Sequence, residues 1–294
     1  MFEFRGVAPP IITPFGEEGS IDESALRDII EWFIENDVHG IVPCGSTGEV
    51  ANLTPAERVR VIEITVDQVR GRVPVIAGTG SPSTARTVEM TRTAGDLGAD
   101  ASLVVTPFYY PLDQKEIEDH YHKVLKETDL PIFLYNVPKF THQSIAPETV
   151  RSLSHHPNAV GIKESSGDMG SFQQMVKETR DRSFHVYCGS GDLFASSLMA
   201  GGSGGILALA NIAPRQCSKI YELYSQNREE GAIDLNYQLL SLNRAIGPKF
   251  GVAGLKAGLR YRGLPAGIPR PPLSPLSGAE EEEMIEIVEQ TLNT

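Results

Sequence analysis

Short apolar segments alternate with longer amphipathic stretches along this chain, and that alternation restricts the fold more than any other feature of the sequence. Eight strand-like segments begin about 20 to 34 residues apart, with a helical pattern between neighbours. They are residues 6–12, 39–43, 73–78, 101–105, 131–135, 159–168, 184–188 and 205–210. Repeated strand–helix units make parallel sheets with right-handed crossovers. Eight of them predict an α/β fold, a closed TIM (β/α)8 barrel over residues 1–213.

The strand pattern stops near residue 213, whereas helical patterns continue to the end of the chain. Four amphipathic stretches predict helices at residues 217–225, 233–245, 251–261 and 279–292. Residues 214–294 are therefore expected to form a small C-terminal helical domain, with a stiff connection at 264–275, which contains five prolines. An open doubly wound sheet is the alternative to the barrel. It is disfavoured because no glycine-rich dinucleotide turn follows the first strand.

Composition argues against several kinds of partner. A formal net charge of −12 disfavours nucleic acids and anionic membranes, since both attract basic surfaces. Residues 1–5 lack the basic region and apolar run that begin a signal peptide, and no segment has 18 consecutive apolar residues, as a membrane-spanning helix would need. A cytoplasmic protein is therefore expected. Cys44, Cys188 and Cys217 are far apart and form no CxxC pair, which argues against a disulfide framework and a zinc site.

Other polar motifs predict neither a metal nor a phosphate site. His120 and His122 are two apart on a predicted helix and do not share a face, and 155–156 is a histidine pair at a helix end. The glycine-rich run 201–205 precedes the eighth strand, so it belongs at the structural end of the barrel. The loop after that strand lacks a glycine run, which favours a substrate without phosphate.

Lys163 lies inside an apolar segment, where a charged side chain needs an explanation. Strand alternation places Val160 and Ile162 on one face, and Gly161, Lys163 and Ser165 on the other. Burial lowers the pKa of a lysine, and the neutral amine can attack a carbonyl to form a Schiff base. A structural ion pair with a carboxylate is the alternative, and Lys163 alone leaves it open.

The barrel fold would bring further polar residues to the carboxyl-terminal ends of the strands, where TIM barrels carry their active sites. Tyr135 ends the fifth strand and is placed to transfer protons, although taken alone it would be a core or rim aromatic. Ser46 and Thr47 offer hydroxyls and backbone N–H groups in a glycine-bounded turn, which suits a substrate carboxylate. Such a turn often has no function beyond reversing the chain.

Tyr109 and the loop 189–192 are expected at the same end of the barrel. Lys139, in the loop after the fifth strand, is the rival lysine there. Its expected exposure would keep it protonated, so a substrate or surface contact suits it better than Schiff-base chemistry. The serines lack a histidine and an acid that the fold would bring to them, which argues against a hydrolase.

Three motifs, 45–49 (GSTGE), 135–138 (YNVP) and 161–164 (GIKE), resemble in this order the N-acetylneuraminate lyase and dihydrodipicolinate synthase family of class I pyruvate aldolases. The resemblance covers nearly the whole chain. It implies a (β/α)8 barrel with C-terminal helices, a homotetramer built from two tight dimers, and no cofactor other than the covalent imine on Lys163.

The resemblance also implies roles for individual residues. Lys163 would form the Schiff base with pyruvate or with the pyruvoyl part of a 2-oxo acid. Tyr135 is similar to the proton-transferring tyrosine of the family, Ser46 to its relay hydroxyl, and Thr47 to its carboxylate contact. Tyr109 is similar to a tyrosine that reaches into the site of a neighbouring subunit. Two positions match residues whose backbone lines the pocket: Gly189 and Ile206.

Two departures from the family pattern affect the expected substrate. Family members that condense pyruvate with aspartate semialdehyde carry an arginine two residues after the proline of the YNVP motif, and Phe140 stands there instead. Phenylalanine cannot replace a bidentate arginine, and Lys139 projects differently from the chain. Ser46 is more typical of sialic-acid lyases, whereas Gly191 replaces an acidic residue expected for the glycerol tail of sialic acid.

These departures favour an aldolase, or else a dehydratase, acting on a 2-keto-3-deoxy sugar acid or a similar 4-hydroxy-2-oxo acid made from pyruvate and an aldehyde. Four residues are expected near the hydroxyls at the far end of this substrate: Ser190, Asp192, Thr141 and His142. The alternative is 4-hydroxy-tetrahydrodipicolinate synthase. A keto-acid sensor is disfavoured by the complete set of proton-transfer residues, and a metal-dependent barrel by the lack of clustered ligands at strand ends.

Overall fold

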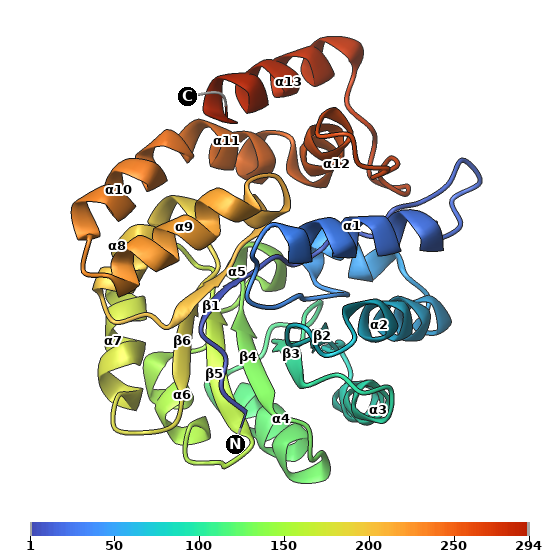
Figure 1. Ribbon diagram of the computed structural model, residues 1–294. Helices are drawn as coiled ribbons and strands as arrows, with labels where there is room; N and C mark the ends of the chain where they lie inside the picture. The colour runs from blue at the N-terminus through green and yellow to red at the C-terminus, as the bar shows by residue number, and fades with distance from the viewer. Residues whose placement is uncertain (1, 293–294) are drawn as a thin grey trace.

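The computed structural model describes residues 2–292 as a curled parallel sheet wrapped by helices (Figure 1). The strand order in the sheet is β1-β7-β6-β5-β4-β3-β2, and all its neighbouring strands are parallel. The seven strands have these bounds: β1 Gly6–Ala8, β2 Ile76–Gly78, β3 Ala101–Val105, β4 Ile132–Asn136, β5 Ala159–Glu164, β6 His185–Cys188 and β7 Gly204–Ile206. Parallel strands bring their carboxyl ends to one end of the sheet.

The segment 39–43 takes the eighth place without forming a regular strand, which corrects the expectation of eight full strands. Within it Val42 bridges Pro10, and Ile41 bridges Val75, both in parallel. The N–H of Val42 donates to the Pro9 carbonyl at 3.0 Å, and the N–H of Ile76 donates to the Ile41 carbonyl at 2.9 Å. Prolines in and beside this segment remove ladder donors and keep the pairing short. The segment closes the gap between β1 and β2.

Other strands also differ from their predictions: β1 ends at Ala8 instead of residue 12, and β2 begins at Ile76 instead of residue 73. The eighth segment, expected to run from 205 to 210, ends at Ile206, and Ala208–Asn211 form a 3-10 helix, η4. Val160 does not share a face with Ile162, because the register of β4 and β5 shifts beside Phe133. A bulge of this kind reverses the alternation locally. Val160 therefore packs inside the barrel with Phe133, whereas Ile162 packs outside it.

Helices cover the outside of the sheet, and their starts follow the capping signals in the sequence. Asp22 caps the first helix, and Thr54 and Asp113 form capping boxes with Glu57 and Glu116. The helices in this layer are α1 Glu23–Glu35, α2 Pro55–Val69, α3 Thr84–Asp96, α4 Gln114–Glu127, α6 Pro147–Leu153, α7 Met169–Thr179, α8 Phe194–Met199 and α9 Pro214–Ser225. A further short helix, α5 Pro138–Thr141, follows β4.

The last part of the chain is helical and lies across one side of the barrel (Figure 1). Its elements are α10 Glu229–Gln238, α11 Leu240–Arg244, the π-helix η5 Ala245–Lys249, α12 Gly251–Tyr261 and α13 Gly278–Leu292. The single helix expected at 233–245 is therefore divided at Leu239. One hydrophobic cluster includes Ile212 and Met284, so barrel and C-terminal side chains share a core. The division into domains 1–213 and 214–294 stays a prediction.

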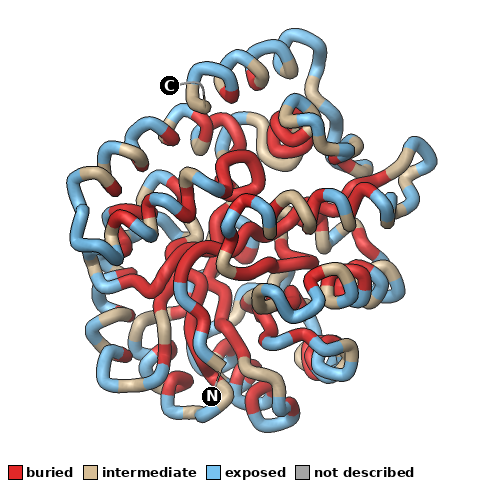
Figure 2. The backbone as a smooth tube through the Cα atoms, viewed as in Figure 1, coloured by how far each residue is buried: buried red, intermediate tan, exposed pale blue. Residues whose placement is uncertain are grey.

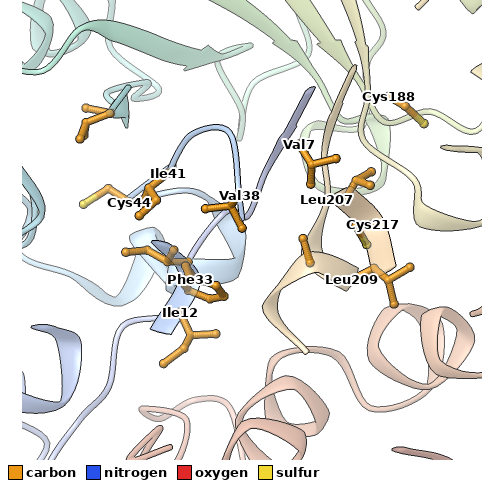
Figure 3. Packing of buried hydrophobic residues seen from close by; sticks show 14 of the residues in the cluster. Val7, Ile12, Phe33, Val38, Ile41, Cys44, Cys188, Leu207, Leu209 and Cys217 are labelled. Carbon is orange, nitrogen blue, oxygen red and sulfur yellow. The ribbon is translucent and has the colours of Figure 1, made fainter. Parts of the chain in front are cut away.

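Buried residues form two apolar layers, one inside the barrel and one between the sheet and the helices. Figure 2 shows burial concentrated in the strands and along the inner sides of the helices. The outer layer contains all three cysteines, which are free and buried among aliphatic side chains (Figure 3). Burial raises the pKa of the Cys188 thiol to about 11. No helix within residues 2–292 is long and apolar enough to span a membrane.

Candidate active site

Lys163 and Tyr135 are direct neighbours on adjacent strands near the carboxyl end of the barrel. The register of β4 and β5 pairs the two residues, and both are 5% exposed. The Nζ atom of Lys163 lies 4.3 Å from the centre of the Tyr135 ring. A tyrosine ring attracts a nearby ammonium through its negative face. The β-ladder therefore fixes an amine and a phenol side by side in a buried position.

Lys163 has no ion pair with any carboxylate in residues 2–292. The adjacent carboxylate, Glu164, is bound elsewhere: it accepts from Asn136 Nδ2 at 2.6 Å and from the Ser166 N–H at 2.5 Å. Burial raises the pKa of Glu164 above its usual value, against these hydrogen bonds. Asn136 also accepts from the Ile145 N–H at 3.0 Å. Glu164 and Asn136 thus lock the ends of β4 and β5 together and leave the Lys163 amine without a carboxylate partner.

Ser46 and Thr47 lie in a one-turn 3-10 helix, η1 Ser46–Gly48, directly after the segment 39–43. Both side chains are half-buried. The turn is held by backbone hydrogen bonds from Gly48 to Gly45 at 3.0 Å and from Glu49 to Ser46 at 3.1 Å. Glu49 follows it in the left-handed region, with φ 55°. The structure therefore places these two hydroxyls at the same end of the barrel as Lys163.

The loop after β6 packs tightly against the end of β5. A Cβ atom at Gly189 would lie 1.8 Å from the Ser165 Oγ, so only glycine fits beside this serine. The Ser165 hydroxyl is buried and has no hydrogen-bond partner among the described residues. It lies two residues beyond Lys163, just past the end of β5, and a role for it was not predicted. In the same loop Ser190 is half-buried and Asp192 is exposed.

The remaining predicted site residues differ in how they lie. Ile206 ends β7 and is buried. Phe140 is 54% exposed on α5, with Lys139 Nζ 5.5 Å from the centre of its ring. The Thr141 hydroxyl lies within hydrogen-bond distance of the carbonyls of Val137 and Gln143. Its proton is therefore already used within the chain. Ile206 thus ends its strand, whereas Phe140 and Thr141 lie on the short helix that follows β4.

Tyr109 projects from the loop after β3 and is 84% exposed, with φ 87°. Its ring contacts that of Tyr110 edge-on, with centroids 5.1 Å apart, and Tyr110 is also exposed. Neither ring is buried within its own chain. Residues 2–292 contain no cluster of three or more histidine, cysteine or acidic side chains that could hold a metal ion.

The structure is thus a barrel of the (β/α)8 type with a buried lysine beside a tyrosine near the carboxyl ends of its strands. A family model described as the dihydrodipicolinate synthetase family matches residues 3–291. Two curated relatives, both called 4-hydroxy-tetrahydrodipicolinate synthase, come from Methanothrix thermoacetophila and Methanopyrus kandleri. The first is 39% identical over 97% of this chain and 96% of its own, and the second is 41% identical over 92% and 91%.

Solved structures agree with this relationship. Dihydrodipicolinate synthase from Thermotoga maritima superposes with a TM-score of 0.95 at 32% identity, covering 99% of both chains. The enzyme from Acinetobacter baumannii, solved in complex with pyruvate, has a TM-score of 0.95 at 32% identity, covering 98% of this chain and 99% of its own. The chain belongs to the dihydrodipicolinate synthetase family. It is an enzyme of the class I aldolase type, a lyase with the predicted TIM barrel fold.

Proposed function

We propose that Lys163 forms the Schiff base with pyruvate, or with the pyruvoyl part of a 2-oxo acid. The observation that carries this proposal is the buried Lys163 amine, which lies over the Tyr135 ring and has no carboxylate partner among residues 2–292. The neutral amine attacks the ketone carbon, and the carbinolamine loses water to give an imine. The imine withdraws electrons from the neighbouring carbon, so the chemistry needs no cofactor.

Tyr135 is proposed to move the protons of these steps. Its phenol protonates the departing oxygen, and the phenolate that results takes a proton from the pyruvate methyl group to give an enamine. The enamine carbon attacks the aldehyde carbon, a carbon–carbon bond forms, and the aldehyde oxygen takes up a proton. Water then hydrolyses the imine and releases Lys163. The reverse sequence cleaves the product. In this proposal Ser46 relays protons to Tyr135, and Thr47 binds the carboxylate through its hydroxyl and the backbone N–H groups of the turn.

Tyr109 is proposed to complete the relay in the site of a neighbouring subunit. Its 84% exposure supports this, because a tyrosine used within its own chain would be expected to lie against that chain's barrel. The proposal includes a homotetramer of two tight dimers and a cytoplasmic location. Light scattering of the purified protein measures the assembly, and a monomer with full activity would contradict the role of Tyr109.

We further propose that the aldehyde partner is derived from a sugar, so that the enzyme makes or cleaves a 2-keto-3-deoxy sugar acid or a similar 4-hydroxy-2-oxo acid. Phe140 supports this choice, because it offers no charge to a second carboxylate where an arginine would bind one. The distal hydroxyls would meet the loop after β6, with Gly189 and Ile206 lining the pocket by their backbone and Ser190 and Asp192 offering side chains.

A second candidate, 4-hydroxy-tetrahydrodipicolinate synthase, is supported by the names of relatives at about 40% identity. The two candidates differ in the aldehyde. The test incubates the purified enzyme with pyruvate and either glyceraldehyde or aspartate semialdehyde, and follows the consumption of pyruvate. The first proposal predicts preferred turnover with glyceraldehyde and pyruvate release from sugar-derived 2-keto-3-deoxy acids. Strong turnover with aspartate semialdehyde alone would establish the second candidate instead.

A further inference from the structure

A second buried lysine, Lys256, lies far from the strand that carries Lys163 and has a carboxylate partner. It is the one charged residue in the apolar first half of α12, and its Nζ lies 2.6 Å from Glu49 Oε1. Both side chains are 0% exposed. Glu49 directly follows the turn that carries Ser46 and Thr47. The ion pair therefore joins the C-terminal helices to a loop of the candidate active site.

Both members of this pair have further contacts. Lys256 also donates to the Ile268 carbonyl at 2.9 Å and lies 4.3 Å from the centre of the Phe15 ring. The other oxygen of Glu49 accepts from the Arg270 N–H at 2.9 Å and from Asn52 Nδ2 at 3.4 Å. Residues 268 and 270 belong to the proline-rich connection after α12. The carboxylate is thus held from two C-terminal elements at once.

Stability alone is a weak explanation for this arrangement. Removing two charges from water costs more than their attraction returns in many proteins, and apolar side chains of similar volume often stabilise a fold as well. Burial lowers the pKa of Lys256 to about 8, so desolvation outweighs the attraction of Glu49 in setting its protonation. A role in holding the geometry of Glu49 is therefore the explanation to test.

The geometry that Glu49 fixes is that of the Ser46–Thr47 turn. The Glu49 N–H donates to the Ser46 carbonyl at 3.1 Å, and the Asn52 N–H donates to the Glu49 carbonyl at 2.8 Å. Glu49 is also one of few non-glycine residues with positive φ, a conformation that needs support from its surroundings. A displacement of the Glu49 side chain would therefore move the backbone that presents the two hydroxyls.

We propose that Lys256 is a positioning residue for the pyruvate site, and that its ion pair with Glu49 holds the turn containing Ser46 and Thr47 in the geometry that binds the substrate carboxylate. This inference rests on the proposed function of Ser46 and Thr47. It assigns to the C-terminal helices a part in forming the site, besides packing against the barrel.

The test replaces the pair by neutral side chains of similar size, in the double variant Glu49→Gln/Lys256→Met. Removal of both charges avoids a buried unpaired ion, so the variant is expected to fold. The pyruvate concentration for half-maximal borohydride trapping is expected to rise about 10- to 100-fold, because a displacement of about 1 Å can cost about 100-fold. The adduct at saturating pyruvate is expected to remain on Lys163. The matched control is Met284→Ala, which opens a cavity between α12 and α13 and leaves the ion pair in place.

Unchanged pyruvate dependence in the folded double variant would overturn the inference, and so would an equal rise in Met284→Ala. If the double variant does not fold, the single variant Lys256→Arg replaces it, since it keeps a positive charge opposite Glu49 and changes the geometry of the pair. A rise of about 3- to 10-fold is expected there, and no rise would overturn the inference. Absence of trapping on Lys163 in the unaltered protein would instead overturn the proposed function, whatever the variants do.

Discussion

The amine of Lys163 lies 4.3 Å from the centre of the Tyr135 ring, and the register of two parallel strands pairs these residues directly. A paired position on neighbouring strands cannot drift without breaking backbone hydrogen bonds. The sheet therefore holds the two chemically active side chains in place before the substrate binds. This reduces the entropic cost of bringing them to the reacting atoms.

Replacement of Tyr135 by phenylalanine removes the proposed proton carrier and keeps the ring over Lys163. We expect kcat to fall about 10²- to 10⁴-fold, the usual effect of losing one acid–base group. The matched control is Tyr261→Phe, which removes a hydroxyl that donates to Glu289 Oε1 at 2.7 Å between α12 and α13, outside the candidate site. This control should keep its kcat. A Tyr135→Phe enzyme with unchanged kcat would show that the hydroxyl takes no part.

Phe140→Arg tests the choice of aldehyde. A new guanidinium at the exposed position 140 can bind a second carboxylate through charge-assisted hydrogen bonds. We expect the KM for aspartate semialdehyde to fall about 10- to 100-fold, the effect of one such contact. Phe140→Leu is the control for loss of the ring. Equal KM values in the two variants would contradict the role given to this position.

Gly189→Ala tests the close contact between the loop after β6 and Ser165. The new Cβ would lie 1.8 Å from the Ser165 Oγ and 2.9 Å from the Ser165 Cβ, so rotation of the hydroxyl alone does not relieve the contact. We expect the free energy of unfolding to fall by about 1–3 kcal/mol, as overpacking does elsewhere. Denaturant unfolding measures this loss. The double variant Ser165→Gly/Gly189→Ala should recover part of it, and an alanine variant as stable as the unaltered protein would contradict the packing described.

His120 predicts how stability depends on pH. It is 5% exposed, and burial lowers its pKa from 6.5 to about 4. The unfolded chain binds this proton at a higher pH than the folded one. The neutral His120 imidazole therefore makes its full contribution to the free energy of unfolding above pH 6.5. This contribution is lost as the pH falls toward 4. At about 1.4 kcal/mol per pKa unit, the loss is about 3 kcal/mol.

Denaturant titrations of the unaltered protein and of His120→Gln at several pH values isolate this contribution. The difference between the two free energies of unfolding should shrink by about 3 kcal/mol from pH 7 to pH 4. A difference that does not change with pH would mean that the folded protein accommodates the charged imidazole.

Much of the architecture follows from local patterns in the sequence. The strand at 101–105 and the helix at 251–261 match their predicted bounds, because an apolar run or an amphipathic period ends at clear turn residues. The segment 39–43 did not form a regular strand, since prolines on its neighbours remove ladder donors that periodicity does not reveal. Val160 faces the barrel interior because of a bulge, and a bulge depends on two strands at once.

The sequence predicted the candidate site less completely than the fold. The position of Lys163 followed from strand alternation, and its neighbour Tyr135 from the order of strands in a barrel. The Glu49–Lys256 pair was missed, because it joins residues more than two hundred positions apart. A single lysine in the apolar stretch 251–259 was the available signal for a buried charge, but it could not name the partner.

The most direct test of the central claim is reductive trapping with pyruvate and borohydride, followed by mass spectrometry of peptides. We expect one adduct per chain, on the peptide that contains Lys163, and none in the variant Lys163→Ala. Lys139 and Lys256 serve as internal comparisons, because one is exposed and the other is paired with Glu49. An adduct on another lysine, or trapping that persists in Lys163→Ala, would contradict the account.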